Sequence, residues 1–184
     1  MRVIGGKFKG VPLKVYSNIR PTSFRIKKGI FDLIREAIDG CVVLDLFSGS
    51  GALGIEALSW GAREVVFVDI HKGCIRTIRY NISRLNLLSF SRLLLKDSFK
   101  AIKDFRTKGI KFDIIFVDPP YYKDMAKKAL QTLDEYDILA PSGYIVVLSY
   151  RHEMVGDYYR NFKVLVVKNY GQSRLYIYKK GSFS

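Results

Sequence analysis

The sequence predicts an α/β fold built on a mostly parallel sheet of seven strands whose last pair is antiparallel. From Val42 onward, short runs of β-branched and apolar residues alternate with helix-length segments, the pattern of βα units. The first five runs are almost continuously apolar, as expected of strands covered on both faces. The last two runs are separated by the turn-like residues 169–172, which are too few for a crossover helix.

Each element follows from a local pattern. Strands are expected at residues 42–46, 64–69, 92–96, 112–117, 143–148, 162–168 and 174–179. Apolar residues at helical spacing predict helices near residues 51–60, 72–87, 98–107 and 124–137.

The first forty residues do not fit this alternation. Residues 1–15 read as a short hairpin interrupted by glycines, and residues 22–38 as a capped amphipathic helix. We therefore expect a basic amino-terminal arm over residues 1–40 and one compact domain over residues 41–184.

Composition narrows the class of protein. A chain of 184 residues is about one domain, and 48% apolar with 26% charged residues excludes a disordered chain, a collagen and a small disulfide scaffold. The net charge of +14 exceeds what solubility requires and favours a polyanionic partner. Residues 1–35 carry +8 of this charge, from Asp32 and nine basic residues: Arg2, Lys7, Lys9, Lys14, Arg20, Arg25, Lys27, Lys28 and Arg35.

The sequence gives little support for a membrane span, a signal peptide or a metal site. The apolar runs are far shorter than a membrane span, and the amino terminus lacks an apolar stretch of signal-peptide length. Cys41 and Cys74 form no metal-binding spacing, and neither His71 nor His152 has a partner at ligand spacing. We expect a reduced, cytoplasmic, monomeric protein without a bound metal.

A glycine loop follows the first expected strand. Gly49, Gly51 and Gly54 match the GxGxxG pattern, in which missing side chains let a ligand approach the backbone. Asp45 lies just before the loop, and Asp69 ends the next strand, where a ribose-binding acid belongs. A carboxylate at this place would repel a pyrophosphate but would suit the positive sulfonium and amino group of S-adenosylmethionine. The loop therefore favours a methyl donor over a nicotinamide dinucleotide.

The tetrapeptide Asp118-Pro119-Pro120-Tyr121 ends the fourth expected strand and is followed by Tyr122. The prolines enforce an extended segment that places the Asp118 carboxylate and the Pro119 carbonyl at the carboxyl edge of the sheet. Two acceptors that hold the hydrogens of an exocyclic amino group can direct its lone pair toward a methyl group, while an aromatic face stacks on the base. The segment thus predicts amino-group methylation on a nucleobase.

The end of the third expected strand offers a further candidate. Asp97 could accept a hydrogen bond from an adenine amino group, or it could cap the helix that starts near Ser98. Both roles are compatible.

Taken together, these motifs carry a resemblance. The opening MRVIGG, RPT at 20–22, DLFSGSGALGIEALSWGA at 45–62, DPPY at 118–121 and the closing YGQSRLYIYKK resemble the RsmD family of bacterial 16S ribosomal RNA guanine-N2 methyltransferases over essentially the whole chain. The sequence departs from that pattern at Ser23-Phe24 and Lys28, where acidic residues are expected, and at Leu148-Ser149.

The resemblance implies a class I, Rossmann-like S-adenosylmethionine-dependent methyltransferase that modifies guanine 966 of small-subunit rRNA. By the same resemblance the glycine loop holds the methionine part, Asp69 the ribose and Asp97 with Ser98 the adenine. The expected cofactor-binding residues are Asp45, Phe47, Gly49, Gly51, Asp69, Ile70, Asp97 and Ser98. Asp118, Pro119 and Tyr121 are the expected catalytic residues, and the expected RNA contacts are Lys7, Lys9, Lys14, Arg20, Arg25 and Tyr122.

Other functions remain open at this stage. An adenine-N6 methyltransferase acting on DNA or RNA would share the DPPY segment, although no separate region is long enough to read duplex DNA. A nicotinamide-dependent oxidoreductase would explain the glycine loop alone. A non-enzymatic RNA-binding module would explain the charge but not the acceptor segment opposite a cofactor loop.

Overall fold

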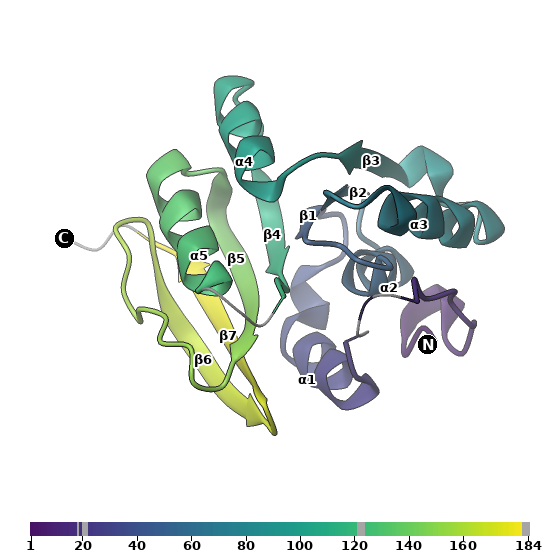
Figure 1. Cartoon of the computed structure of the whole chain (residues 1–184), viewed down its shortest axis with the longest axis horizontal. Helices are drawn as coiled ribbons and strands as arrows, with labels where there is room; N and C mark the ends of the chain where they lie inside the picture. The colour runs from purple at the N-terminus through teal and green to yellow at the C-terminus, as the bar shows by residue number, and fades with distance from the viewer. Residues whose placement is uncertain (18, 20–21, 121–123, 182–184) are drawn as a thin grey trace.

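A mixed sheet of seven strands forms the centre of the molecule (Figure 1). The computed structural model describes residues 1–17, 19, 22–120 and 124–181. The strands lie in the order β3-β2-β1-β4-β5-β7-β6. Their bounds are β1 Val42–Leu46, β2 Glu64–Asp69, β3 Ser91–Leu95, β4 Phe112–Val117, β5 Leu139–Tyr150, β6 Phe162–Tyr170 and β7 Ser173–Lys180.

The predicted sheet is confirmed, including its antiparallel end. Strands β1 to β5 pair in parallel, whereas β7 is antiparallel to both β5 and β6. Strand β5 begins four residues earlier than expected, at Leu139. Ser142 has a φ of 63° there, and the register with β4 shifts between Phe112 and Ile114. The extra residues thus pair around a local irregularity that the apolar pattern did not indicate.

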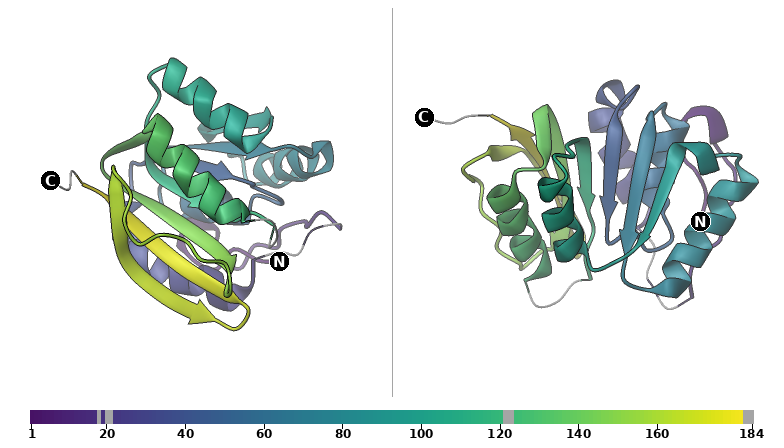
Figure 2. Two further views of the ribbon diagram at one scale, coloured as in Figure 1. Left: turned by 60° about the vertical axis from the view of Figure 1, so that its left-hand side comes forward. Right: turned by 90° about the horizontal axis from the view of Figure 1, so that it is seen from above.

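Helices cover both faces of the sheet, and Figure 2 shows α1 and α5 on opposite sides of it. One apolar cluster joins α1, α2 and α3 to one face, and a second joins α4 and α5 to the other. The helix bounds are α1 Phe24–Ile34, α2 Ala52–Ser59, α3 Lys72–Arg84, α4 Ser98–Thr107 and α5 Met125–Tyr136, with short 3₁₀ turns η1 Gly6–Phe8, η2 Arg35–Ala37 and η3 Leu88–Phe90. No helix among the described residues is long and apolar enough to cross a membrane.

The amino-terminal segment packs into the body of the protein. Its first residues form the expected irregular hairpin, with backbone hydrogen bonds between Val3 and Val11 and around the turn η1. Val3 and Leu13, together with the apolar face of α1, are buried in the same cluster as the sheet. Residues 1–40 therefore share one core with the rest of the chain, and a functional division at residue 40 stays a proposal.

Helix α1 begins two residues later than the capped helix expected from Thr22. Ser23 is its N-cap, and the Ser23 hydroxyl accepts a hydrogen bond from the Ile26 N–H. The Thr22 hydroxyl is engaged elsewhere, as described below.

Candidate active site

Three carboxylates converge at the carboxyl edge of the parallel strands. Asp45 lies in β1, Asp69 ends β2 and Asp118 follows β4. Because side chains alternate along a strand, all three belong to the sheet face that carries Phe67 and Phe116 and that α1 to α3 cover. Burial raises the pKa of Asp45 well above its usual range, and the nearby Asp118 and Asp69 raise it further. The site is therefore built to receive positive charge.

The glycine loop has the geometry that its sequence predicts. Gly49 and Gly51 have φ values of 56° and 78°, a region that favours glycine, and Gly51 is the N-cap of α2. A Cβ at Gly54 would lie 2.3 Å from the Phe67 ring, so only glycine allows this approach of helix to strand. The Gly54 N–H donates to Asp45 Oδ2 at 3.0 Å. Asp45 thus fixes the start of α2 against β1.

Asp69 holds the other side of the loop. Its Oδ2 accepts a hydrogen bond from the Gly49 N–H at 2.8 Å, and its Oδ1 accepts one from the His71 N–H at 2.8 Å. The carboxylate is buried and anchored at the end of β2. The binding of a ribose by this carboxylate stays a prediction.

The expectation that His71 lacks a partner at ligand spacing is wrong. The possible ligand atoms of Asp69, His71 and Cys74 all lie within 4.8 Å of one another, and His71 Nδ1 is 3.1 Å from Asp69 Oδ1. The group is a conceivable metal site by residue type. Burial and the adjacent Asp69 raise the pKa of the Cys74 thiol to about 12, so the thiol is protonated at neutral pH.

The residues expected around the adenine lie at the same edge. Asp97 is the N-cap of α4, and its Oδ1 accepts a hydrogen bond from the Lys100 N–H at 3.0 Å, which confirms the capping role. Ser98 is buried, whereas Ile70 is exposed directly after β2. Phe47 has a φ of 57°, and its ring lies edge-on to Phe99 with centroids 5.9 Å apart. Their contact with a cofactor stays a prediction.

Asp118 makes a hydrogen bond with the amino-terminal segment. The Thr22 hydroxyl donates to Asp118 Oδ2 at 2.7 Å. Burial raises the pKa of Asp118 to about 6, although the bond from Thr22 lowers it. Pro119 is buried, and Tyr121 and Tyr122 lie outside the described residues.

Four described residues of the amino-terminal segment, Lys14, Tyr16, Ile19 and Thr22, contact α3, the glycine loop or Asp118. The Lys14 N–H donates to Asn81 Oδ1 at 2.9 Å, and the Tyr16 N–H donates to Ser50 Oγ at 2.9 Å. Ile19 lies against Gly49, where an added Cβ would be 2.8 Å from Ile19 Cδ1. The same amino-terminal segment therefore contacts both the expected cofactor loop, through Tyr16 and Ile19, and the expected catalytic carboxylate, through Thr22.

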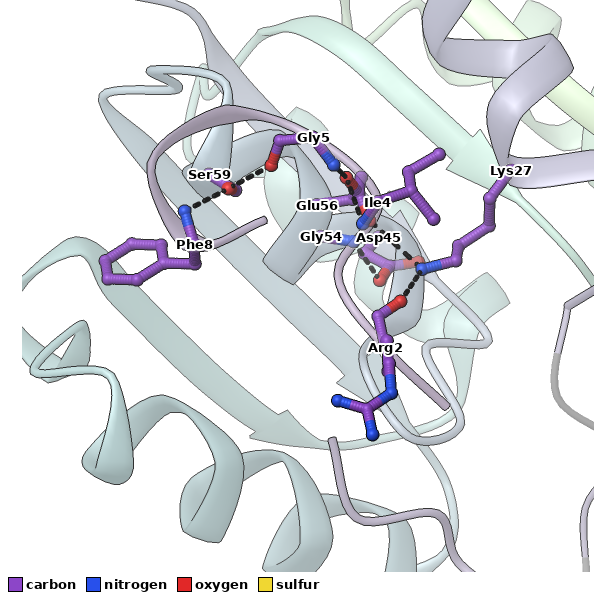
Figure 3. A network of polar contacts seen from close by, with 9 residues as sticks. All are labelled: Arg2, Ile4, Gly5, Phe8, Lys27, Asp45, Gly54, Glu56 and Ser59. Atoms are coloured by element: carbon purple, nitrogen blue, oxygen red, sulfur yellow. Dashed lines mark hydrogen bonds and ion pairs between the residues drawn. The ribbon is translucent and has the colours of Figure 1, made fainter. Parts of the chain in front are cut away.

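A buried ion pair holds the amino terminus to α2 (Figure 3). Lys27 Nζ lies 3.0 Å from Glu56 Oε2, with the two side chains 1% and 0% exposed. Glu56 also accepts hydrogen bonds from the Ile4 and Gly5 N–H groups, and Lys27 Nζ donates to the Arg2 carbonyl at 2.7 Å. Lys27 is thus engaged inside the protein, so its charge, although counted in the +8 of residues 1–35, is not presented to a polyanion.

The basic residues expected to contact RNA lie on the surface. Lys7, Lys9, Lys14 and Arg25 are exposed, and Arg20 lies outside the described residues. Lys14 Nζ lies 5.1 Å from the centre of the Tyr80 ring. These residues are accessible to a polyanion, and their contact with RNA stays a prediction.

Sequence reasoning missed Thr22, Lys27 and Glu56. Glu56 carried a signal, since it is the one acidic residue in the apolar stretch 52–59 and a buried carboxylate needs a partner. Lys27 carried a signal too, because helical spacing places it on the apolar face with Ile30 and Ile34, whereas Lys28 does not share that face. The Thr22 contact joins residues 96 positions apart, beyond the reach of a local pattern.

Comparisons with known proteins agree over almost the full length. A family model described as "Conserved hypothetical protein 95" matches residues 1–179. "Putative rRNA methyltransferase YlbH" of Bacillus subtilis is 38% identical over 186 residues, covering 98% of this chain and 99% of the relative. "Ribosomal RNA small subunit methyltransferase D" of Buchnera aphidicola is 32% identical over 147 residues, covering 79% and 75%.

A solved structure supports the same relationship. "Putative methyltransferase yhhF from Escherichia coli" has a TM-score of 0.86 and 27% identity, covering 100% of this chain and 99% of that one. The shared architecture is the class I methyltransferase fold, with a mostly parallel sheet and an antiparallel end. The chain therefore belongs to the RsmD family, described by its family model as conserved hypothetical protein 95.

Proposed function

We propose that the protein transfers a methyl group from S-adenosylmethionine to the N2 amino group of a guanine in 16S ribosomal RNA, and that this guanine is nucleotide 966. One observation carries the proposal. The carboxylate of Asp118, on the strand end that leads into Pro119-Pro120, belongs to the same sheet face and edge as Asp45 and Asp69. An acceptor for an amino group and carboxylates for a cationic donor therefore meet at one place.

The charge of the site supports the choice of donor. Asp45 and Asp69 flank the glycine loop, and each is bonded to a backbone N–H of that loop. A pyrophosphate would add negative charge beside these carboxylates, whereas S-adenosylmethionine brings a sulfonium and an amino group that they attract. When bound, this donor supplies an electrophilic methyl group.

The chain's own residues would prepare the amino group. The Asp118 carboxylate and the Pro119 carbonyl would each accept one N2 hydrogen, so that the nitrogen lone pair faces the methyl carbon. The lone pair forms the new nitrogen–carbon bond while the carbon–sulfur bond breaks, and its electron pair stays on sulfur. One N2 proton then leaves to Asp118 or to water. Because the Asp118 pKa is about 6, the carboxylate is mostly ionised at pH 7 and basic enough to share that proton.

The substrate follows from charge and kinship. The chain carries +14, with +8 in residues 1–35. Two relatives with the family's full domain are named as ribosomal RNA methyltransferases, one of them for the small subunit. The resemblance to the RsmD family supports guanine 966 as the methylated nucleotide.

The test locates the transferred methyl group. Purified protein is incubated with isotope-labelled S-adenosylmethionine and small ribosomal subunits that lack methylation at nucleotide 966. The RNA is then digested, and the labelled nucleoside and its position are identified by mass. We expect N2-methylguanosine at nucleotide 966.

Two outcomes would contradict parts of the proposal. Labelled N6-methyladenosine would assign the chain to the alternative amino-methylating class, and methylation of another guanine would refute the position alone. Asp69→Ala is expected to weaken S-adenosylmethionine binding by about 1 to 3 kcal/mol, because ribose hydroxyls lose their acceptor. Calorimetry that showed tighter binding of NADH would refute the choice of cofactor.

A further inference from the structure

Phe24 is exposed close to the catalytic edge. It is the first residue of α1, and 66% of its surface is accessible. It lies two residues after Thr22, whose hydroxyl contacts Asp118. The ring is absent from the buried clusters that hold the helix to the sheet. Folding therefore does not use this side chain, and it is free to contact a ligand.

Two hollows flank the Phe24 ring. The first, of about 200 Å³, is lined by Arg2 and Thr22 as well as by Phe24, so it begins beside the partner of Asp118. The second, of about 330 Å³, is lined by Lys9, Lys28 and Phe24 together with Trp60. Because Phe24 lines both, the two hollows together are a candidate path from Thr22, the partner of Asp118, across the amino-terminal surface.

The charge along this path favours an anionic strand. Lys9, Arg25 and Lys28 are exposed around the ring. Lys28 is paired with Asp32 at 2.6 Å, but both side chains are more than half exposed, and such a pair opens at little cost. An exposed aromatic ring among cations is the chemistry of single-stranded nucleic-acid binding, in which a base stacks on the ring and phosphates meet the cations.

We propose that Phe24 stacks on a nucleotide next to the target base, on the RNA strand that leaves the active site, and that Lys9 and Lys28 hold the phosphates of that strand. The proposal rests on the proposed function, because it takes an RNA strand as substrate. It adds a residue that determines how the strand is held outside the catalytic centre. A protein partner would satisfy the apolar ring but would leave the surrounding cations without matching charge.

Direct binding tests the inference. The probe is a fluorescein-labelled single-stranded RNA of ten nucleotides, and its fluorescence anisotropy is measured at several salt concentrations. Phe24→Ala and Phe24→Leu are expected to weaken binding by about 5- to 100-fold at every salt concentration, because stacking on the ring is lost. Phe24→Trp is expected to bind within about 2-fold of the wild type or better, because it keeps a stacking face.

The salt dependence separates stacking from charge. Stacking releases no counterions, so Phe24→Ala is expected to keep the wild-type slope of log affinity against log salt. Lys9→Ala with Lys28→Ala is expected to flatten that slope by about 0.7 for each lost phosphate contact. Phe90→Ala is the matched control, because Phe90 is also an exposed ring, with 48% of its surface accessible. It lies directly before β3, at the amino end of that strand and away from the carboxyl edge that holds the candidate site. The Phe90→Ala variant is expected to bind as the wild type does.

Wild-type affinity in Phe24→Ala, or an equal loss in Phe90→Ala, would overturn the inference, as would full retention of binding by Phe24→Leu. The outcome is independent of methyl transfer. A protein that binds this RNA through Phe24 but methylates no ribosomal RNA would refute the proposed function alone. A protein that methylates ribosomal RNA with an unchanged KM in Phe24→Ala would refute the role of Phe24 alone.

Discussion

Replacing Lys27 by Met is expected to destabilise the protein strongly. The Lys27 ammonium is 3.0 Å from Glu56 Oε2, and the two side chains are 1% and 0% exposed. Removing one partner leaves the Glu56 charge buried without its counterion, which typically costs about 3 to 5 kcal/mol of unfolding free energy. The Ile4 and Gly5 N–H groups still donate to Glu56, which favours the lower end of that range.

Thermal unfolding followed by circular dichroism at pH 7 measures the loss. For a protein of this size, 1 kcal/mol shifts Tm by about 2 to 4 °C, so Lys27→Met should lower Tm by about 6 to 20 °C. Lys28→Met is the matched control. It removes an exposed pair with Asp32 and should cost less than about 1 kcal/mol.

A double variant isolates the charge. Lys27→Met combined with Glu56→Gln removes both charges but keeps an acceptor for the Gly5 N–H, so it should be more stable than Lys27→Met alone. If Lys27→Met were no less stable than Lys28→Met, or if the double variant regained nothing, the buried pair would not hold the amino terminus to α2 as argued.

The remaining predictions concern activity. Asp118→Ala should lower the methyl-transfer rate by roughly 100-fold or more while calorimetry shows near wild-type cofactor binding, and wild-type turnover would refute its role. Thr22→Val removes a hydrogen bond that lowers the Asp118 pKa, so the acidic limb of the pH profile of kcat/KM should move from near pH 6 to higher pH. Thr22→Ser keeps the hydroxyl and should restore the limb to its wild-type position. A limb that does not move in Thr22→Val would count against this contact. Replacing Lys7, Lys9 and Lys14 by Ala should flatten the salt dependence of RNA binding and raise KM for RNA without changing cofactor affinity, and an unchanged slope would exclude them from docking.

The sequence predicted the sheet well because buried parallel strands are locally distinct. Continuous apolar runs located β1, β2 and β4 to the residue, because strands covered on both faces carry such runs. Helix starts were harder to predict. Thr22 and Ser23 are both N-cap residue types, yet Ser23 caps α1 while the Thr22 hydroxyl donates to Asp118, which lies far away in the chain.

The site residues that lie at the ends of strands could be predicted from the sequence. Asp45, Asp69 and Asp118 could be placed at one edge because parallel strands end together. The amino-terminal segment could not be placed, because its hydrogen bonds to Ser50 and Asn81 and its ion pair with Glu56 involve single residues without a repeating pattern. It was expected as an arm because its pattern does not fit the alternation of strands and helices, whereas its buried residues contribute to the core.

The three carboxylates also bear on the choice between cofactors. Burial, and then the nearby Asp118 and Asp69, raise the pKa of Asp45, so ionising Asp45 within this cluster costs stability. A fold selected for stability alone would replace at least one of these acids by a neutral residue, so their retention indicates a functional demand. A cation at the glycine loop offsets the repulsion and favours ionised Asp45, whereas a pyrophosphate there would increase it. The repulsion among these carboxylates therefore favours the binding of a sulfonium cofactor.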